Sequence, residues 1–337
     1  MKATCLWSCF LCLSVFAGAA LAYPTYTGPA LRCRIANSCP SGHHTTLALK
    51  RFAELAAERS GNKITIALFP NNILGNDAAM LREVLRGNLE MASCTSSNLT
   101  STIPSLMVFD LPYITDGNHQ EALYASLDTG PLGAFFQKKF DEAGLRPIMY
   151  NEYGYRDFFS TRKPIRSPKD LVGLRIRTTC SPVEAEVAKA LGMRPLPLAW
   201  WETHDALKRD VVDAEGNVLS ILRDAGHADT LRYGYLSRHN YAMHILSANS
   251  VWWNGLDPQA KRLLREAAKD ALRHQRTILV PQSEPQARER LEALGVRIVE
   301  PTPEQLAELK RKTRPVWELF GDSVPQELIE LVLETQK

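Results

Sequence analysis

The sequence lacks the short motifs that mark the common hydrolases and metalloenzymes. It contains no G-x-S-x-G nucleophile elbow and no H-E-x-x-H zinc motif, and no C-x-x-C pair occurs beyond residue 22. The adjacent His43 and His44 are by themselves a weak signal for a metal site. We therefore expect no catalytic residues, no metal and no cofactor in this chain.

An excess of charge of either sign is also missing. The 40 Lys and Arg and the 37 Asp and Glu give a formal net charge of +3, and no long block of like charges occurs. Proteins that bind nucleic acids usually carry a strongly basic surface, so we expect no nucleic-acid partner. The 337 residues are enough for two lobes of ordinary domain size. We expect the protein to be a monomer.

A long apolar run is absent beyond the first 22 residues. These begin with the basic Lys2, continue through the apolar stretch CLWSCFLCLSVFAGAA and end in Ala20-Leu21-Ala22. A basic start, a short apolar core and a small-x-small site predict a signal peptide over residues 1–22. The apolar run is too short to cross a bilayer comfortably, which disfavours a membrane anchor. We therefore expect a soluble protein that is exported to the periplasm.

Cysteine is scarce once the signal peptide is removed. Of seven cysteines, three leave with it, and Cys33, Cys39, Cys94 and Cys180 remain. An even number in an oxidising compartment permits disulfides without requiring them. Cys39 and Cys94 each follow a predicted strand, so a bridge between them is possible, and two free thiols fit the sequence equally well. No partner is evident for Cys180.

Strand and helix patterns alternate along the chain. Alternating or short apolar runs predict strands at 31–36, 64–68, 89–93, 146–150, 174–177, 196–198, 211–213 and 296–299. Apolar residues at helical spacing predict helices at 43–59, 77–86, 131–140, 182–191, 202–208 and 218–222, and Thr302-Pro303-Glu304 begins a last one. This alternation favours an α/β fold, with mixed sheets flanked by helices.

Two segments carry clear signals for the start of a helix. Ser181-Pro182-Val183-Glu184 predicts a capping box with proline in the first helical position. Asp257-Pro258 begins a helix in the same way, and its apolar periodicity continues toward Leu294. A helix of this length predicts a bridge between two interleaved lobes. We expect lobe I to contain residues 23–152 and about 243–283, and lobe II to contain 153–242 and about 284–337.

Several segments point to one family. They are RFAELAAERSGNKITIALFPNNILGND, VFDLPYI, YGYRDFFSTRKPIRSPKDLVGLRIR and the stretch from there through TTCSPVEAEVAKALGMRPLPLAWWETHDALKRDVVDAEGNVLSIL. Together they resemble the solute-binding proteins of tripartite ATP-independent periplasmic (TRAP) transporters, of the C4-dicarboxylate-binding DctP type, over essentially the whole mature chain. The resemblance implies a two-lobed, type II-like periplasmic binding protein. Such a protein captures a small organic acid and delivers it to membrane permease subunits that use an ion gradient.

The resemblance implies that Arg177 pairs with the carboxylate of the ligand. A guanidinium presents a planar fork of donors that matches a carboxylate and stays charged. The residue pattern alone would favour an ordinary surface ion pair for this arginine. Arg156 corresponds to a second family arginine, which either contacts the ligand or supports Arg177. Asn217 corresponds to a binding asparagine, and its alternative role is to cap the helix at Val218.

One part of this region departs from the family pattern. The chain reads DAEGNV where relatives have a sequence such as DGQENP, so Gly216 replaces a polar neighbour of the asparagine. The turn geometry and the ligand preference are open at this point. Trp200 matches an aromatic residue that stacks on the ligand. For Trp201 we expect a place in the core, and for Glu202 a structural role at a helix start.

The first lobe should add polar contacts from the ends of its strands. Thr95 and Asn98 in CTSSN are the candidates, together with His44, whose alternative is a capping or solvent-facing role. His239 and Tyr241 are weaker candidates. A tryptophan beside a polar loop favours a hydroxylated or ring-bearing acid over succinate. A secreted hydrolase and a ligand sensor that docks on a membrane receptor are the alternative functions.

Overall fold

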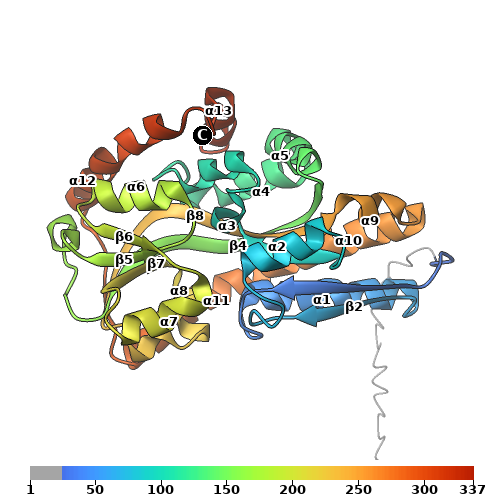
Figure 1. Cartoon of the computed structure of the whole chain (residues 1–337), viewed down its shortest axis with the longest axis horizontal. Coiled ribbons are helices and arrows are strands. Elements are labelled where there is room, and N and C mark those ends of the chain that lie inside the picture. The colour runs from blue at the N-terminus through green and yellow to red at the C-terminus, as the bar shows by residue number, and fades with distance from the viewer. Residues whose placement is uncertain (1–24) are drawn as a thin grey trace, which may run out of the picture.

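The computed structural model describes residues 25–337, and the predicted signal peptide lies outside them (Figure 1). One mixed sheet runs through the molecule in the order β2-β1-β3-β8-β4-β7-β5-β6, and β9 pairs with β8. Its strands are β1 (Leu31–Asn37), β2 (Ile64–Phe69), β3 (Met91–Thr95), β4 (Leu145–Ser160), β5 (Arg175–Thr178), β6 (Arg194–Pro197), β7 (Ala214–Asn217), β8 (Tyr233–Asn249) and β9 (Arg297–Val299). Helices cover both faces, as expected for an α/β fold.

The two longest strands, β4 and β8, are shared by both lobes. They pair antiparallel along their length; β3 pairs with 244–248 of β8, whereas β7 pairs with 157–160 of β4. The strands β1 to β3 therefore extend the sheet at one end of this pair, and β5 to β7 extend it at the other (Figure 1). The expected two-lobed architecture is confirmed, with the lobes joined through continuous strands.

The shared strands are irregular in the middle. The pairing of β4 with β8 shifts register between Glu152 and Gly154, and again between Arg156 and Phe158. Gly154 has a φ of 129°, and a Cβ there would lie 3.3 Å from Val218 Cγ1, so a larger residue would be strained. Bulges bend strands and strengthen their twist. These two bulges place the bend of the sheet at the junction of the lobes.

The helices enclose the sheet on both sides. They are α1 (His44–Ser60), α2 (Asp77–Leu85), α3 (Ser96–Leu99), α4 (Gln120–Thr129), α5 (Pro131–Glu142), α6 (Pro182–Ala190), α7 (Trp200–Lys208), α8 (Leu219–Asp224), α9 (Ser250–Gly255), α10 (Pro258–His274), α11 (Val280–Ala293), α12 (Pro303–Thr313) and α13 (Gln326–Glu334). Fully buried Leu49 and Phe52 of α1 share one hydrophobic core with Leu264 of α10. In the other lobe, Leu222 of α8 packs in a core with Leu291 of α11.

The predicted bridging helix is confirmed. α10 and α11 are joined by one π-helical segment, Gln275–Leu279, so that the helical backbone continues from Pro258 to Ala293. Asp257 caps its start by accepting a hydrogen bond from Gln259 N at 2.8 Å. Beyond it, α12 packs on α6, and α13 returns to lie beside α5 (Figure 1). Among residues 25–337, no helix has both the length and the apolar character needed to cross a bilayer.

Several expectations for local structure were wrong. The strand expected at 211–213 begins at Ala214, where the backbone first pairs with both β4 and β5, so that Asn217 ends it. The capping box at Ser181 is not formed: Ser181 makes no capping hydrogen bond, and Glu184 instead accepts from Thr179 N at 2.9 Å. Trp201 is 61% exposed and lies outside the core, because α7 turns its other face inward.

The four cysteines of the described residues are free thiols, so of the two alternatives for Cys39 and Cys94 the structure has the one without a bridge. Cys39 follows β1, whereas Cys94 lies inside β3 and donates to Asp77 O at 3.6 Å. Both side chains are buried, and burial raises their pKa well above the usual thiol value.

Candidate ligand-binding site

A narrow cavity lies between the lobes at the ends of β3, β5 and β7, and we call it the arginine cavity. Its lining side chains come from both lobes: Ser38, Cys39, Asp77, Thr95, Asn98, Tyr153, Arg156, Arg177, Trp200, Asn217, Ile221 and His244. The structure thus brings together six of the nine candidate ligand-binding residues. The cavity encloses about 20 Å³, which is roughly the space for one water molecule. The lobes must separate before an organic acid can enter.

Arg177, in β5, is the arginine of this cavity that forms no ion pair within 4 Å with a described residue, although the carboxylates of Glu184 and Glu215 are near enough to favour its charged form. Its side chain is 2% exposed, and its Nε donates to Leu198 O at 3.1 Å. No described residue accepts a hydrogen bond from its two terminal nitrogens. Burial, and then the neighbouring Arg156, lower the pKa of Arg177 below its ordinary value. A buried guanidinium with free donors is complementary to an anion.

Arg156, in β4, is by contrast paired within the protein. Its Nη1 donates to Gly216 O and to Asn217 Oδ1, both at 3.1 Å, and its Nε lies 3.2 Å from Glu184 Oε1. Burial opposes the charge, but Glu184 and other anionic neighbours raise the pKa of Arg156 above the ordinary value. The Glu184 that sequence assigned to a helix cap is thus the counter-ion of a buried arginine.

Asn217, at the end of β7, is held on both sides of its amide. Its Oδ1 accepts from Arg156, from Tyr153 OH at 3.3 Å and from Val218 N at 3.1 Å. Its Nδ2 donates to Glu215 Oε2 at 3.3 Å. The expected alternative as a helix cap is not formed, because the residue that precedes α8 is Val218, without a side-chain cap. Asn217 thus connects Arg156 and Tyr153 of β4 to Glu215 in one hydrogen-bond network.

That network fixes the aromatic wall of the cavity. Burial opposes ionisation of Glu215, but His227 outweighs it and the pKa of Glu215 is lowered; the two side chains are 2.6 Å apart. The His227 ring stacks on Trp200 with 4.6 Å between ring centroids. The Arg177 guanidinium lies 5.8 Å from the centroid of the Trp200 ring. The indole is therefore held beside the free end of Arg177.

Lobe I faces these groups with oxygen atoms. Asp77 Oδ2 accepts from Thr95 N at 3.3 Å and from Asn98 Nδ2 at 2.8 Å. Asp77 Oδ1 and Thr95 Oγ1 are buried and have no partner among the described residues. Asn98 Oδ1 accepts from Cys180 N at 3.3 Å, which is a direct contact between the lobes. Asp77 was missed in the sequence because its pattern is that of an ordinary first helical residue.

Two predicted residues, His44 and His239, lie outside the arginine cavity. His44 faces Ser220 Oγ at 3.4 Å and Gln275 Nε2 at 3.2 Å. His239 stacks on Phe158 with 4.0 Å between centroids. Burial lowers the pKa of both imidazoles to about 3, which keeps them neutral. The weaker candidate Tyr241 donates to Glu152 Oε2 at 2.6 Å.

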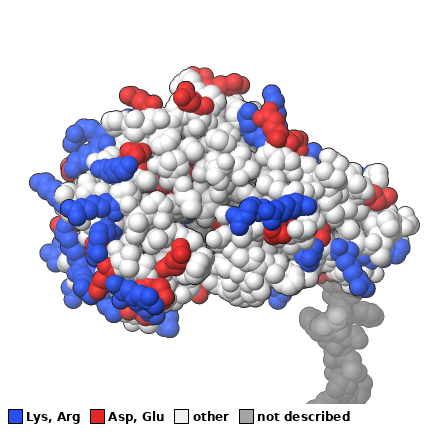
Figure 2. Space-filling view, viewed as in Figure 1, with Lys and Arg blue, Asp and Glu red and all other residues white. Residues whose placement is uncertain are grey.

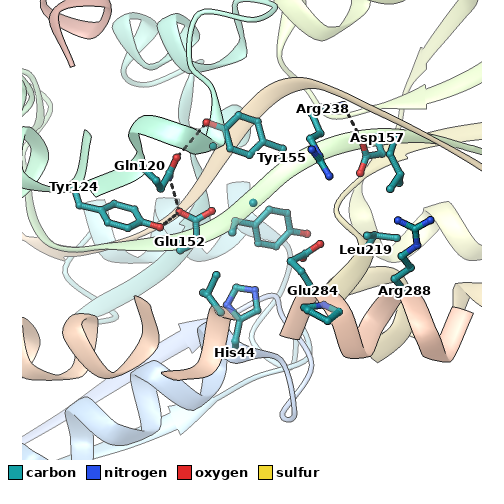
Figure 3. A pocket seen from close by; sticks show the side chains of 16 residues that line it. His44, Gln120, Tyr124, Glu152, Tyr155, Asp157, Leu219, Arg238, Glu284 and Arg288 are labelled. Carbon is teal, nitrogen blue, oxygen red and sulfur yellow. Dashed lines mark hydrogen bonds between the residues drawn. The ribbon is translucent and has the colours of Figure 1, made fainter. Parts of the chain in front are cut away.

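A second, larger cavity of about 440 Å³ lies behind the bend of β4 and beside the start of α11 (Figure 3). We call it the hinge cavity. His44 lines it, together with the carboxyl groups of Glu152, Asp157 and Glu284. Figure 3 shows Glu152 hydrogen-bonded to Gln120 and Tyr124, whereas Glu284 extends from the helix toward the middle of the cavity. Within residues 25–337, no three side chains of His, Cys, Asp or Glu come together as metal ligands.

The outer surface differs from the interior of the arginine cavity. On the face shown in Figure 2, basic side chains predominate around the rim of lobe II, with acidic ones scattered among them, and the middle of that face is largely uncharged. Arg156 and Arg177 do not contribute to this outer surface, because each is only 2% exposed.

Comparison with known proteins gives a consistent family. The profile of the bacterial extracellular solute-binding proteins, family 7 (DctP), matches residues 35–323. The 2,3-diketo-L-gulonate-binding periplasmic protein YiaO of Escherichia coli K12 is 28% identical over 299 residues, 86% of this chain and 88% of the relative. The C4-dicarboxylate-binding protein DctB of Bacillus subtilis 168 is 27% identical over 304 residues, 90% and 85% of the two chains.

A solved structure agrees with these relatives. The sugar acid binding protein DctPAm from Advenella mimigardefordensis, in complex with galactonate, superposes with a TM-score of 0.87 at 27% identity, over 91% of this chain and 98% of that chain. The matches support a binding protein over a secreted hydrolase or a sensor, because they cover both lobes and the cavity between them. The chain belongs to the bacterial extracellular solute-binding proteins of family 7, the DctP-type binding proteins of TRAP transporters.

Proposed function

We propose that this chain captures a small organic acid between its lobes through Arg177 and delivers it to the membrane permease subunits of a TRAP transporter. The buried guanidinium with two free terminal nitrogens is the observation that carries this proposal. A carboxylate fits that fork with two parallel hydrogen bonds. The relatives that bind a diketo-gulonate, a C4-dicarboxylate and galactonate support an acid as the shared ligand chemistry.

In this mechanism the acid binds lobe II first. Arg177 binds the carboxylate, and the Trp200 ring covers one face of the carbon skeleton. Arg156 stabilises the end of β7 beside this site through its hydrogen bonds to Gly216 O and Asn217 Oδ1. Closure then brings Thr95 and Asn98 of lobe I against the rest of the ligand, and excluding water strengthens each polar contact. His44 and His239 act at the hinge, away from the ligand, as structural residues.

We place the boundaries of the lobes at the bulges of the shared strands. Lobe I comprises residues 23–152 and about 243–283, and lobe II comprises 153–242 and about 284–337. The register shift between Glu152 and Gly154 lies opposite Met243 and Ala242, at the first of these boundaries. The π-helical segment Gln275–Leu279 lies near the other, where an irregular helix can absorb a change of angle. Bending at these points opens the arginine cavity.

Delivery requires that the chain reach the outer side of the membrane that holds the permease. Residues 1–22 serve as the cleavable signal peptide for export to the periplasm, on the basis of their sequence. The protein performs no chemistry on the acid. It acts by differential affinity, binding tightly when closed and releasing the acid when the permease favours the open form.

A thermal-shift screen tests this function. The protein without residues 1–22 is heated with a library of organic acids and, as matched controls, with the corresponding primary amides and alcohols. A ligand at one hundred times its Kd stabilises the folded state by about 2.7 kcal/mol, so binding acids raise the Tm measurably. Neutral counterparts are expected to leave it unchanged. Equal shifts from acids and their amides would contradict the proposal.

A further inference from the structure

The lobe I side of the arginine cavity contains an oriented carboxylate that the capture of an acid group does not use. Asp77 is the first residue of α2 and is 6% exposed. Its Oδ2 accepts hydrogen bonds from Thr95 N and Asn98 Nδ2, whereas its Oδ1 is buried without a partner, and Asp77 is one of the residues that line the cavity. An acceptor oxygen left unpaired in a buried place costs free energy, unless a ligand supplies the donor.

Thr95 adds a second unpaired oxygen beside the first. Its backbone N–H is the one that holds Asp77, and its own Oγ1 is buried without a partner in the same cavity. A carboxylate only accepts hydrogen bonds, whereas a threonine hydroxyl both donates and accepts. A ligand hydroxyl matches this pair, because it can donate to Asp77 Oδ1 while it accepts from Thr95 Oγ1.

A second carboxylate on the ligand has no cationic partner at this end. Among the described residues that line the cavity, the two arginines are its only guanidinium or ammonium groups, and both belong to lobe II. Burial lowers the pKa of His244 to about 4, so it is neutral at physiological pH. Asn98 has its amide engaged by Asp77 and Cys180. A distal carboxylate would therefore face the like charge of Asp77 in a site with little water.

We infer that Asp77, supported by Thr95, selects hydroxylated monocarboxylates of the sugar-acid class and rejects C4-dicarboxylates. The inference rests on the proposed function, since it takes Arg177 as the holder of the single carboxylate. Arg177 and Asp77 then bind opposite ends of one ligand: Arg177 binds the carboxylate, and Asp77 accepts a hydrogen bond from a hydroxyl group. The Trp200 ring, which lines the same cavity, suits the carbon face of a sugar acid.

Isothermal titration calorimetry with D-galactonate and succinate tests this assignment. The wild-type protein should bind galactonate more than tenfold tighter than succinate. Asp77→Asn keeps the shape of the side chain but removes its charge, so it should weaken galactonate binding and strengthen succinate binding, each by about tenfold. Asp322→Asn, which removes an exposed carboxylate elsewhere, serves as the charge-matched control and should change neither.

Two further variants keep the result interpretable. Thr95→Val should weaken galactonate but not succinate, and it tests the same end of the cavity if Asp77→Asn does not fold, as judged by its ligand-free circular dichroism. The inference is overturned if wild-type protein binds succinate as tightly as galactonate, or if Asp77→Asn changes both affinities by one factor. Arg177→Ala distinguishes a failure of the proposed function from a failure of this inference. If this variant binds both acids as tightly as wild type, the proposed function is wrong. If it loses affinity for both acids, the proposed function stands and the other variants decide the role of Asp77.

Discussion

The arginine cavity and the hinge cavity differ in volume and in the pairing of their polar groups, and a choice of binding site by volume alone would select the hinge cavity. The hinge cavity is the larger, about 440 Å³ against about 20 Å³. Its carboxyl groups are nevertheless mostly satisfied: Glu152 accepts from two tyrosines and a glutamine, and Asp157 accepts from Arg238 N at 2.8 Å. The small cavity instead places a free guanidinium opposite a free carboxylate oxygen. Unpaired groups of opposite sign, more than open space, identify the site of binding.

The largest expected effect is a loss of ligand affinity when the arginine cavity loses its anchor. Arg177→Ala should weaken binding of an acid ligand by about 2 to 5 kcal/mol, because the ligand carboxylate loses its partner in a closed site. Calorimetric titration with the tightest acid from the thermal screen measures the loss. Arg175→Ala is the control, since this arginine lies on the same strand but is exposed and paired with Asp213. Similar losses in the two variants would refute the anchor role.

An intermediate effect belongs to the hinge cavity. Burial, offset in part by Ser220, raises the pKa of Glu284 from 4.5 to about 7. A carboxyl group with a raised folded-state pKa stabilises the fold below its unfolded pKa, and this stabilisation is lost as the pH rises through about 7. Glu284→Gln removes the charge that forms at high pH. We therefore expect the change in the free energy of unfolding caused by this substitution to be about 1 to 3 kcal/mol more stabilising at pH 8 than at pH 4.

Urea unfolding at the two pH values measures this difference. Glu266→Gln, at an exposed position of α10, is the control and should show no such dependence on pH. If Glu284→Gln changed the free energy of unfolding equally at pH 4 and pH 8, the buried carboxyl would not be the source.

The smallest effect concerns His44, which sequence placed among the ligand-binding residues. Because its ring faces Ser220 and Gln275 in the hinge cavity, His44→Gln should change acid affinity by less than about threefold, while the lost buried hydrogen bonds lower stability by about 1 kcal/mol. Paired calorimetry and thermal unfolding check the two numbers. A tenfold loss of affinity with little loss of stability would return His44 to the ligand site.

Much of the fold was predictable from local pattern, but its two longest strands were not: β8 was not predicted, and β4 was predicted only in part. The strands at Leu31 and Ile64 and the bridging helix from Asp257 follow from periodicity and capping, because those signals are local. β4, predicted to end at Tyr150, continues to Ser160 because β8 pairs with it there. That pairing joins parts of the chain far apart in sequence, which no local pattern encodes.

The lining of the arginine cavity was predicted in part from the family resemblance and, for Thr95 and Asn98, from their place at the end of a lobe I strand. Arg177, Arg156 and Asn217 lie together as the resemblance implied. His44 and His239 were chosen as polar residues near helix or strand ends, and both rings face hydrogen-bond or stacking partners outside the arginine cavity. Asp77 was missed, because a carboxylate at a helix start is normally explained by the helix dipole. The one signal that separates it from such residues is an unpaired oxygen, which is visible only in three dimensions.

The sharing of β4 and β8 by both lobes has a consequence for how this chain can be made and altered. The segment 161–232 separates the two strands in sequence and must be synthesised before they can pair. The two ends of the sheet therefore cannot join until β8 has been made. A fragment that ends before residue 233 would leave the edge of β3 unpaired and open to association with other chains. Neither lobe can therefore be exchanged between relatives as one contiguous stretch of gene.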